Sequence, residues 1–381
     1  MTSIPVMRPF LGPEEQVAAA EAVASGWVAQ GPRVAQFERE FAARVQAGYG
    51  VAVSSCTAAL HLGMVLHGIG RGDEVVVPSL SFIATANAVR CTGATPVFAD
   101  VDVKTGNITA KTVDAVRTTA TRAVLVVHQA GVPADLDELH GLCDPAGLPV
   151  LEDAACAAGS THRDRPVGAG SALAAWSFHP RKLLTTGEGG MLTVEDEAAA
   201  VRLRRLREHG MDVSAADRHA GSAPVVESYL ETGFNYRLTD IQAAVGLVQL
   251  GRLDAVVTRR RELAARYQAL LAEVPGLLTV GDPTYGTTNY QSFWVLLPDD
   301  FPITRNRLMV LMHEAGISTR RGIMAAHLEP AYAGHPHGDL SKTEQLSEQS
   351  VILPLFHEMT DEQQDRVVAV LRAAARTSPG K

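Results

Sequence analysis

Three groups of residues in this sequence have the types and the settings to carry out chemistry together. The first is Lys182, which follows an apolar run ending at Phe178 and precedes the glycine-rich turn at 187–190. A lysine held at a strand end in a partly dry pocket loses its proton more readily than a solvated one, and the neutral amine attacks aldehydes. This setting predicts a lysine that forms a Schiff base, with a solvated surface lysine as the alternative.

The second group is a carboxylate at the end of another apolar run. Val150 and Leu151 lead directly into Glu152 and Asp153. In open α/β sheets, side chains just beyond the carboxyl ends of the strands face the crevice in which ligands bind. An anion at that place can keep the ring nitrogen of pyridoxal phosphate (PLP) protonated, so that the ring acts as an electron sink. The competing interpretation is that Asp153 caps a following helix.

The third group is a turn that joins a β-branched run to a helix. Val51–Val53 is followed by Ser54 and Ser55, and Cys56–Leu62 has the composition of a helix. The free amides and the dipole at a helix start favour an anion, and Ser or Thr hydroxyls can add hydrogen bonds. The pattern predicts a phosphate site, with an ordinary helix cap as the alternative.

In this order, the three groups resemble the nucleotide-sugar aminotransferases, the DegT/StrS-like branch of the fold-type I PLP enzymes. The similar segments are the family's N-terminal loop, phosphate turn, ring-covering segment, aspartate motif, lysine motif and dimer-crossing stretch: 25–32, 56–62, 81–88, 152–155, 177–182 and 233–244. The resemblance extends over nearly the whole chain. It implies an α/β fold, with a mostly parallel mixed sheet covered by helices in a large domain and a smaller α+β C-terminal domain.

The resemblance also implies a role for individual residues. Lys182 would bind PLP and move a proton, Asp153 would pair with the pyridine nitrogen, and Phe82 would stack on the ring. The phosphate would be held by the amides of Cys56 and Thr57, the hydroxyls of Thr57 and Ser177, and Asn235 of the partner subunit. The chain is therefore expected to form a homodimer with shared active sites.

Cys156 departs from the family pattern. Many relatives have Gln or His at this place, three residues after the aspartate, and Ala158 stands where a histidine is common. A thiol is a weak hydrogen-bond partner. The contact that relatives make from this place to the phenolic oxygen of the cofactor is therefore not carried over to this chain.

The substrate-binding residues are predicted from a basic segment that follows an expected strand. Arg320 and Arg321, with His327 nearby, have donors suited to grip a diphosphate; a solvated basic turn is the alternative. The turn Gly187-Glu188-Gly189-Gly190 resembles that of enzymes acting at C4, since C3 enzymes more often have Asp at the second place. The predicted function is transfer of an amino group, from glutamate, to the C4 keto group of a nucleotide-linked deoxy-keto-sugar.

Two other functions are compatible with these residues. An enzyme on the same scaffold can aminate a keto-cyclitol or a related antibiotic precursor. A PLP-binding regulatory protein without turnover is a more remote alternative, and the intact pair of Lys182 and Asp153 argues against it.

Composition sets limits on the protein class. The chain has 381 residues, of which 46% are hydrophobic, which suits two domains, predicted at 1–252 and 253–381. Its net charge of −8 argues against nucleic-acid binding. No apolar stretch approaches the ~20 residues of a membrane helix, and no signal pattern is recognised, so a cytoplasmic protein is expected. The four cysteines lack C-x-x-C spacing, which predicts neither a metal site nor disulfides.

The elements that must position these residues follow an alternating pattern. Strands are expected at 74–77, 96–101, 123–128, 148–152, 174–178 and 191–194, separated in most cases by helical patterns. Such alternation predicts a largely parallel sheet. The last two strands are separated only by the Lys182 segment, which favours antiparallel pairing. An apolar stripe from Leu253 to Val274 predicts a long helix that connects the two domains.

Overall fold

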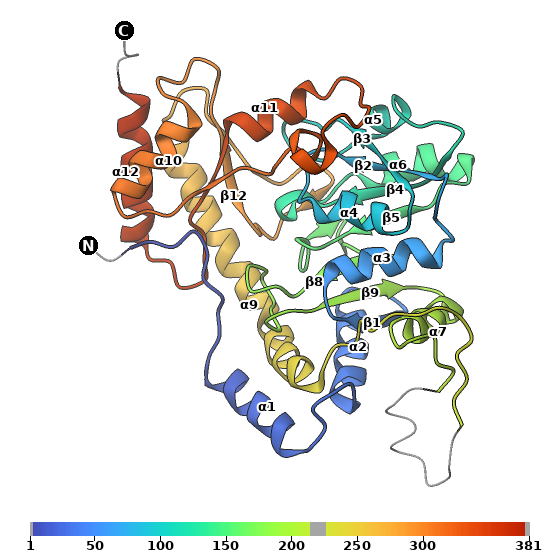
Figure 1. Ribbon diagram of the computed structural model, residues 1–381. Helices are drawn as coiled ribbons and strands as arrows, with labels where there is room; N and C mark the ends of the chain where they lie inside the picture. Colours follow the sequence, from blue (N-terminus) through green and yellow to red (C-terminus); the bar gives the residue numbers. More distant parts are fainter. Residues whose placement is uncertain (1–2, 214–225, 378–381) are drawn as a thin grey trace.

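The computed structural model of the protein describes residues 3–213 and 226–377 (Figure 1). Its centre is a seven-stranded mixed sheet in the order β1-β9-β8-β5-β4-β2-β3. These strands are β1 (Tyr49–Val53), β2 (Glu74–Pro78), β3 (Thr95–Ala99), β4 (Thr121–Val127), β5 (Val150–Asp153), β8 (Ala174–Ser177) and β9 (Gly190–Val194). Strands β3, β2, β4, β5 and β8 pair in parallel, and β9 runs antiparallel to both of its neighbours.

The strands form from short apolar runs that the sheet buries on both faces. On β1, the side chains of Val51 and Val53 pack with helices α3 (Cys56–Leu66), α4 (Ala84–Cys91) and α7 (Glu197–Leu206). Ala52, between them, packs on the other face with α2 (Pro32–Arg44) and α9 (Asp240–Leu271). Successive strand residues point to opposite faces, so both faces need apolar side chains, as in sheets with mainly parallel strands.

Helix α9 connects this sheet to a second, four-stranded sheet. Figure 1 shows α9 running from α1 (Pro13–Ala24) and α2 at one end to α10 (Arg305–Glu314) and α12 (Asp361–Ala375) at the other. The second sheet has the order β10-β12-β14-β13, and its strands are β10 (Leu278–Thr279), β12 (Phe293–Leu296), β13 (Arg320–Arg321) and β14 (Ser350–Leu353). Within the described residues, α9 is the one helix long and apolar enough to cross a membrane. It packs against α1 and α2 near one end and against α12 near the other.

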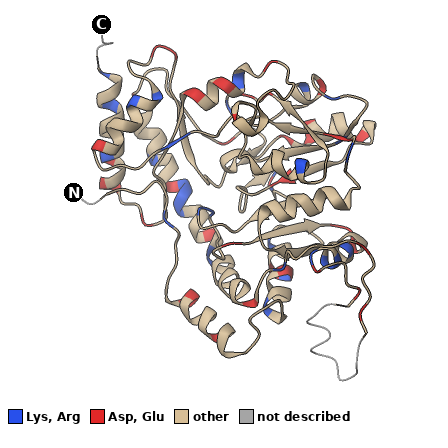
Figure 2. Ribbon diagram, viewed as in Figure 1, with Lys and Arg blue, Asp and Glu red and all other residues tan. Residues whose placement is uncertain are grey.

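The remaining elements pack around the two sheets. The helices are α5 (Ala110–Asp114), α6 (Leu136–Cys143) and α11 (Ser341–Gln349), with 3-10 turns η1 (Gln129–Gly131), η2 (Asp144–Ala146), η3 (Ala326–Leu328) and η4 (Pro330–Tyr332). A small three-stranded sheet contains β6 (Thr161–His162), β7 (Arg165–Pro166) and β11 (Gly286–Thr287). Figure 2 shows that α3 carries no charged residue, whereas α7 carries several arginines.

The structure confirms the predicted fold class and the antiparallel pairing of β8 with β9. The long helix begins earlier than the stripe from Leu253 indicated. Thr239 caps it with a reciprocal hydrogen-bonding box to Gln242, and its first half, packed on the large sheet, does not show a clean stripe. The predicted domain boundary at 252 and 253 falls inside this uninterrupted helix, so the two parts of the chain share one helix.

A buried ion pair fixes β1 against α7. The guanidinium of Arg207 donates to the carboxylate of Glu38 and, over 2.6 Å, to the carbonyl oxygen of Ala52. Glu38 also accepts from the amide of Ala52 over 2.9 Å. Both side chains are buried, so each charge depends on the other, and losing one partner of such a pair is strongly destabilising. The end of β1, where α3 begins, is thereby held in place.

Gly190 is a close-packed position in this frame, and we expect Gly190→Ala to destabilise the protein by about 1–3 kcal/mol. A Cβ there would lie 2.5 Å from the carbonyl carbon of Ser55 and 2.6 Å from the amide nitrogen of Cys56. Both are backbone atoms, so the start of α3 must shift. Urea unfolding midpoints measure the loss.

The matched control is Gly141→Ala, because Gly141 lies inside α6 with no atom within 4 Å of an added Cβ. Alanine is a better helix former than glycine, so this variant should unfold at an equal or higher urea concentration. Equal midpoints for the two variants would show that the start of α3 accommodates the methyl group.

Candidate active site

Lys182 lies in the tight connection between β8 and β9. The connection is closed by backbone hydrogen bonds from Phe178 to Gly189 (2.9 Å) and from Thr186 to Phe178 (3.0 Å). The amide of Lys182 also donates to the carbonyl oxygen of His179 over 2.8 Å. The half-buried side chain places Nζ 3.1 Å from the Sγ atom of Cys156. The lysine is therefore presented by a rigid turn rather than by a mobile loop.

The pKa of Lys182 differs from the expectation of a lowered value. Burial acts to lower the pKa of this amine, but Cys156, Cys56 and Asp153 act in the opposite direction, and the net shift of the pKa is upward. The cause is the surrounding groups, which stabilise an ammonium. In this arrangement the lysine must give up a proton before its nitrogen can act as a nucleophile.

Asp153 ends β5 as a buried carboxylate, 5% exposed. It accepts hydrogen bonds from the hydroxyl of Thr85 (2.9 Å) and the amide of Ala155 (3.2 Å). Burial raises the pKa of Asp153; the hydrogen bonds and the nearby Lys182 and His128 oppose this rise without cancelling it. The carboxylate thus lacks a full counter-charge in the protein itself, which suits a binding partner that brings a protonated nitrogen.

Thr85 is a site residue that the sequence analysis did not identify. Its hydroxyl links Asp153 to Ser81, whose Oγ lies 2.8 Å away. Its place in segment 81–88 could have indicated a role at the site, but only Phe82 of that segment was given one. Thr85 holds the carboxylate of Asp153 in one orientation.

The predicted phosphate turn has the expected form. Ser55 is the N-cap of α3, and its hydroxyl accepts the amide of Ala58 over 3.1 Å. The amides of Cys56 and Thr57, at the first two positions of the helix, have no intrahelical acceptors. Ser177 is half-buried and pairs with Gly190 on β9, whose backbone abuts Ser55. The structure therefore brings the predicted amide and hydroxyl donors to neighbouring strand ends.

Phe82 is exposed in the segment that leads into α4. Its side chain is 65% exposed, although large aromatic rings are normally buried. The flanking residue Ser81 is fixed by its amide, which donates to the carbonyl oxygen of Met324 over 3.1 Å. An aromatic ring held by a fixed backbone but left uncovered is suited to pack against a bound planar group.

The segment that contains Asn235 runs beside the phosphate turn of its own chain. The amide of Ser54 donates to the carbonyl oxygen of Tyr236 over 2.8 Å, and Val53 forms a bridge with Arg237. Asn235 itself is exposed. Its side chain is accessible to a second copy of the chain, and its role across a dimer axis stays a prediction.

The structure separates the three residues that were predicted to grip a diphosphate. Arg320 and Arg321 are consecutive residues of β13, so their side chains leave opposite faces of the strand. Arg321 pairs with Glu329 over 3.0 Å. His327 is buried, with Nδ1 2.6 Å from Ser79 Oγ and Nε2 3.2 Å from Glu344 Oε1. Of the three, Arg320 lines a cavity beside the Lys182 turn, and the binding of a diphosphate by these residues stays a prediction.

Arg320 lines a small cavity beside the Lys182 turn together with Arg181 and Arg260. The cavity has a volume of about 80 Å³, and no Asp or Glu is among its lining residues. Burial and the charge of Arg181 lower the pKa of Arg320. Among the described residues, neither Arg181 nor Arg320 forms an ion pair with a carboxylate. The cavity is therefore a concentration of positive charge without a protein counter-charge.

Arg260 contributes the buried part of this charge. Its guanidinium donates to three carbonyl oxygens, those of Tyr290 (2.8 Å), Gln291 (2.8 Å) and Leu355 (3.0 Å). Burial lowers its pKa to about 9. Sequence reasoning missed Arg260 because its place in the long helix gives no sign of burial. Only the tertiary structure brings it against the carbonyl oxygens of residues 290, 291 and 355.

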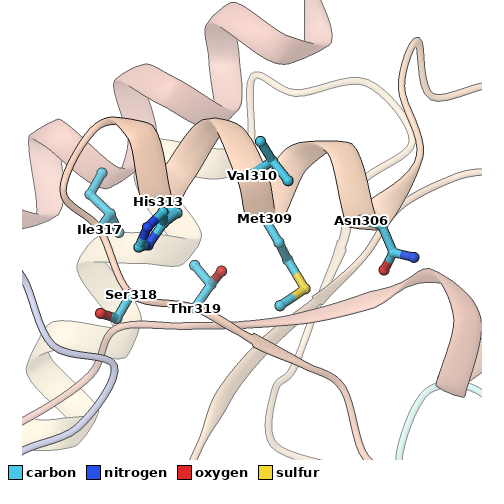
Figure 3. A pocket seen from close by; sticks show the side chains of 7 residues that line it. All are labelled: Asn306, Met309, Val310, His313, Ile317, Ser318 and Thr319. Carbon is cyan, nitrogen blue, oxygen red and sulfur yellow. The ribbon is translucent and has the colours of Figure 1, made fainter.

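Two other features lie apart from this site. Asp135, Asp137 and His162 have ligand atoms within 4.8 Å of one another, but Arg163 pairs with Asp137 over 3.0 Å, so the cluster already contains a cation and we assign no metal to it. An open groove on the C-terminal part is lined by α10 and the following segment (Figure 3). Its residues are Asn306, Met309, Val310, His313, Ile317, Ser318 and Thr319. The imidazole of His313 is the one titratable group in this set, which contains no carboxylate, lysine or arginine.

The arrangement around Lys182 fits PLP. It combines an amine on a rigid turn, an incompletely balanced buried carboxylate, an uncovered aromatic ring and a helix start with free amides. These groups correspond to the aldehyde, ring nitrogen, ring face and phosphate of this cofactor. Cys156 lies against the amine, with Sγ 3.1 Å from Nζ.

Comparisons with known proteins give one consistent picture. The sequence model of the DegT/DnrJ/EryC1/StrS aminotransferase family matches residues 9–372. The chain is 39% identical over 375 residues to the spore coat polysaccharide biosynthesis protein SpsC of Bacillus subtilis (strain 168), covering 97% of this chain and 96% of that protein. It is similar to the structure of S. venezuelae DesV in complex with a ketimine intermediate, at 35% identity and a TM-score of 0.90, over 99% and 100% of the two chains. It is also similar to DesI in the presence of its TDP-sugar product, at 32% identity and a TM-score of 0.88, over 99% and 94%.

The raised pKa of Asp153 predicts that this carboxyl group makes the cofactor-free protein less stable as the pH rises. The folded state holds the proton of this carboxyl to a higher pH than the unfolded chain, whose value is about 3.9. Its contribution to stability is therefore most favourable below the unfolded pKa and is lost as the pH rises through the folded pKa. Asp153→Asn removes the ionisation, so the variant should lose less thermal stability than the wild type as the pH rises over this window.

Thermal unfolding of the two cofactor-free proteins across the acidic to neutral range measures the difference. Asp300→Asn, which changes an exposed carboxylate, is the control and should follow the wild type. Parallel stability curves for wild type and Asp153→Asn would contradict a raised pKa of Asp153.

Proposed function

Because the chain belongs to the DegT/DnrJ/EryC1/StrS aminotransferase family, we propose that it transfers an amino group from glutamate to the C4 keto group of a nucleotide-linked deoxy-keto-sugar. The chain is a sugar aminotransferase that uses PLP. The observation that carries the assignment of its residues is the placement of Lys182 and Asp153 at one edge of the large sheet. Each acts electrostatically on the other.

The residues divide the work of holding the cofactor. Lys182 would hold PLP through its amine and move a proton at the substrate carbon that bears the amino group. Asp153, fixed by Thr85, would keep a proton on the ring nitrogen, and Phe82 would cover one face of the ring. When bound, PLP supplies an electron sink for the carbon that loses its proton. The turn at Cys56 and Thr57, with Ser177, would hold the phosphate.

The nucleotide-linked acceptor and the C4 position are each supported by one observation. DesI, to which the chain is similar over nearly its full length, was solved with a TDP-sugar product. Glu188 in the turn after Lys182 resembles the pattern of enzymes that act at C4, and its main-chain oxygen is fixed by the hydroxyl of Thr186 (2.7 Å) and the amide side chain of Gln242 (2.7 Å). The turn thus has one defined shape near the site.

The amino donor is supported by the arginine cavity. Its volume of about 80 Å³ is too small for a nucleotide, and pockets for drug-sized ligands hold roughly 300 Å³ or more. A carboxylate matches the planar fork of a guanidinium. Arg181 immediately precedes Lys182 in the chain, so a dicarboxylate such as glutamate can place one carboxylate near Arg181, Arg260 and Arg320 while its amino group approaches Lys182.

The dimer is supported by apolar side chains that the single chain leaves exposed near its N-terminus. Leu11, Val17, Val23 and Val28 are 52%, 56%, 55% and 48% exposed. They lie on and around α1, which packs on the end of α9 (Figure 1). Large apolar side chains left exposed near one another in the sequence are a feature of protein interfaces. Asn235 is the residue that we assign to the active site of the second chain.

The reaction itself is tested with purified PLP-loaded protein, glutamate and three acceptors. We expect an aminated product, detected by mass spectrometry, from a TDP-linked 4-keto-6-deoxy sugar, and little or none from the 3-keto isomer or a free keto-cyclitol. Turnover of the cyclitol without any nucleotide requirement would favour the alternative function. Turnover of the 3-keto isomer would contradict the C4 assignment alone.

Arg181→Gln and Arg320→Gln should each raise the KM for glutamate about tenfold or more. A lost hydrogen bond to a charged group is worth about 1.5–3 kcal/mol, and 1.4 kcal/mol corresponds to about tenfold. The KM for the sugar nucleotide should change much less. Arg163→Gln, which changes an exposed arginine of the β6–β7 turn, is the control. A raised KM for the nucleotide sugar with an unchanged KM for glutamate would place the diphosphate, rather than the donor, at Arg320.

A mixed dimer tests whether the active sites are shared. Lys182→Ala and Asn235→Asp chains are each expected to be inactive or weakly active alone. In a shared arrangement, the mixed dimer has one site with both lesions and one intact site, so about half of its sites should recover activity. No recovery, with dimers verified by mass, would show that each chain builds its own site.

A further inference from the structure

The contact between Cys156 and Lys182 joins two nucleophiles that the proposed reaction does not use together. The Sγ and Nζ atoms are 3.1 Å apart. Cys156 is half-buried in the turn that follows Asp153, and Lys182 is half-buried in the turn that follows β8. The two turns come from strands that are hydrogen-bonded neighbours, β5 and β8. The pairing of the strands therefore brings the sulfur and the amine together.

Both backbones are fixed, so the contact is not an accident of two loose loops. The side-chain amide of Asn289 donates to the carbonyl oxygens of Cys156 and Ala158, over 2.8 Å each. On the other side, Gln291 donates to the carbonyl oxygen of Arg181 over 2.5 Å. Asn289 and Gln291 belong to the same short segment, which thus holds both turns. A fixed amine beside a thiol is in place to capture an electrophilic sulfur.

The other cysteines are less suited to react with Cys156. Cys56 faces the same group of residues, but burial and the nearby Asp153 raise the pKa of its thiol. A protonated thiol is a poor nucleophile. Cys143 is buried and Cys91 is exposed, on α6 and α4 respectively. Lys182 is best placed to capture an oxidised Cys156 by geometry, because its Nζ atom lies 3.1 Å from the Sγ atom.

We propose that Cys156 is an oxidative modification site at which a peroxide converts the Cys156–Lys182 pair into a sulfur–nitrogen link. In the first step, the thiol of Cys156 is oxidised by hydrogen peroxide to a sulfenic acid, and the peroxide is reduced to water. In the second, the neutral amine of Lys182 attacks the sulfur, the S–N bond forms, and the S–OH oxygen leaves as a second water. The protein loses two hydrogens and each peroxide yields two waters, so atoms and electrons balance.

The link removes the amine that the proposed function assigns to the cofactor, on which this consequence rests. Cofactor bound to Lys182 uses the same amine, so bound cofactor should protect Cys156 and Lys182 from forming the link. Thiols reduce sulfur at this oxidation level, so the modification is reversible. Because the pKa of Lys182 is raised, the neutral amine is scarcer at low pH, and the link should form faster as the pH rises.

The test uses the full chain, stripped of cofactor and treated with hydrogen peroxide near equimolar concentration. Remaining thiols are then blocked and the protein is digested without reductant. We expect a peptide pair joined through Cys156 and Lys182, two hydrogen masses below the sum of the free peptides and separated by dithiothreitol. The treated protein should also lose most of its ability to regain visible absorbance when PLP is added, and dithiothreitol should restore it.

Two variants define the outcome. Cys91→Ser removes the exposed thiol and should behave as the wild type, whereas Cys156→Ser should give no joined peptide and should regain absorbance after peroxide. A disulfide between Cys56 and Cys156, sulfur acids without any link, or equal sensitivity of Cys156→Ser would each overturn the proposal. A link that forms without affecting PLP uptake would support the modification and contradict the cofactor role of Lys182.

Discussion

The parallel pairing of β5 with β8 is the constraint on which the site depends. Its register places Asp153 beside Ala175, and the amide of Ala154 donates to the carbonyl oxygen of Ala175 over 2.8 Å. Because both strands end at the same edge of the sheet, the carboxylate of Asp153 and the turn that carries Lys182 emerge together. A slip of one residue would turn Asp153 to the opposite face.

The antiparallel direction of β9 brings the phosphate turn to the same end of the sheet as Asp153 and Lys182. Its antiparallel pairing with β8 and β1 makes the connection through Lys182 short and rigid, and it brings Gly190 against the start of α3. The phosphate turn and the lysine turn are thereby parts of one hydrogen-bonded unit. The absence of a side chain at residue 190 is what allows the two to approach so closely.

Two charged features of the site make the folded chain less stable by itself. These are a buried carboxylate with a raised pKa and an arginine cavity without lining acids. Such groups cluster at functional sites because bound partners supply the missing counter-charges. Elsewhere the protein pairs its buried charges closely, as Glu38 and Arg207 show. The contrast separates the residues that hold the fold from those that await a ligand.

Sequence by itself determined the local parts of this protein. Apolar runs ending in Asp153 or leading to Lys182, and the hydroxyl turn before Cys56, indicate strand ends and a helix start because these features depend on neighbours in the chain. The strand order, the unbroken helix across residues 252 and 253, and the contact between Cys156 and Lys182 were decided by tertiary structure. The same holds for the arginines: residues 320 and 321 look equivalent in the sequence, but a strand sends them to opposite sides, and packing between two sheets joins Arg320 to the distant Arg181 and Arg260. The local sequence pattern indicates on which face or at which end of an element a residue lies. Only long-range packing decides which residues from other elements contact it.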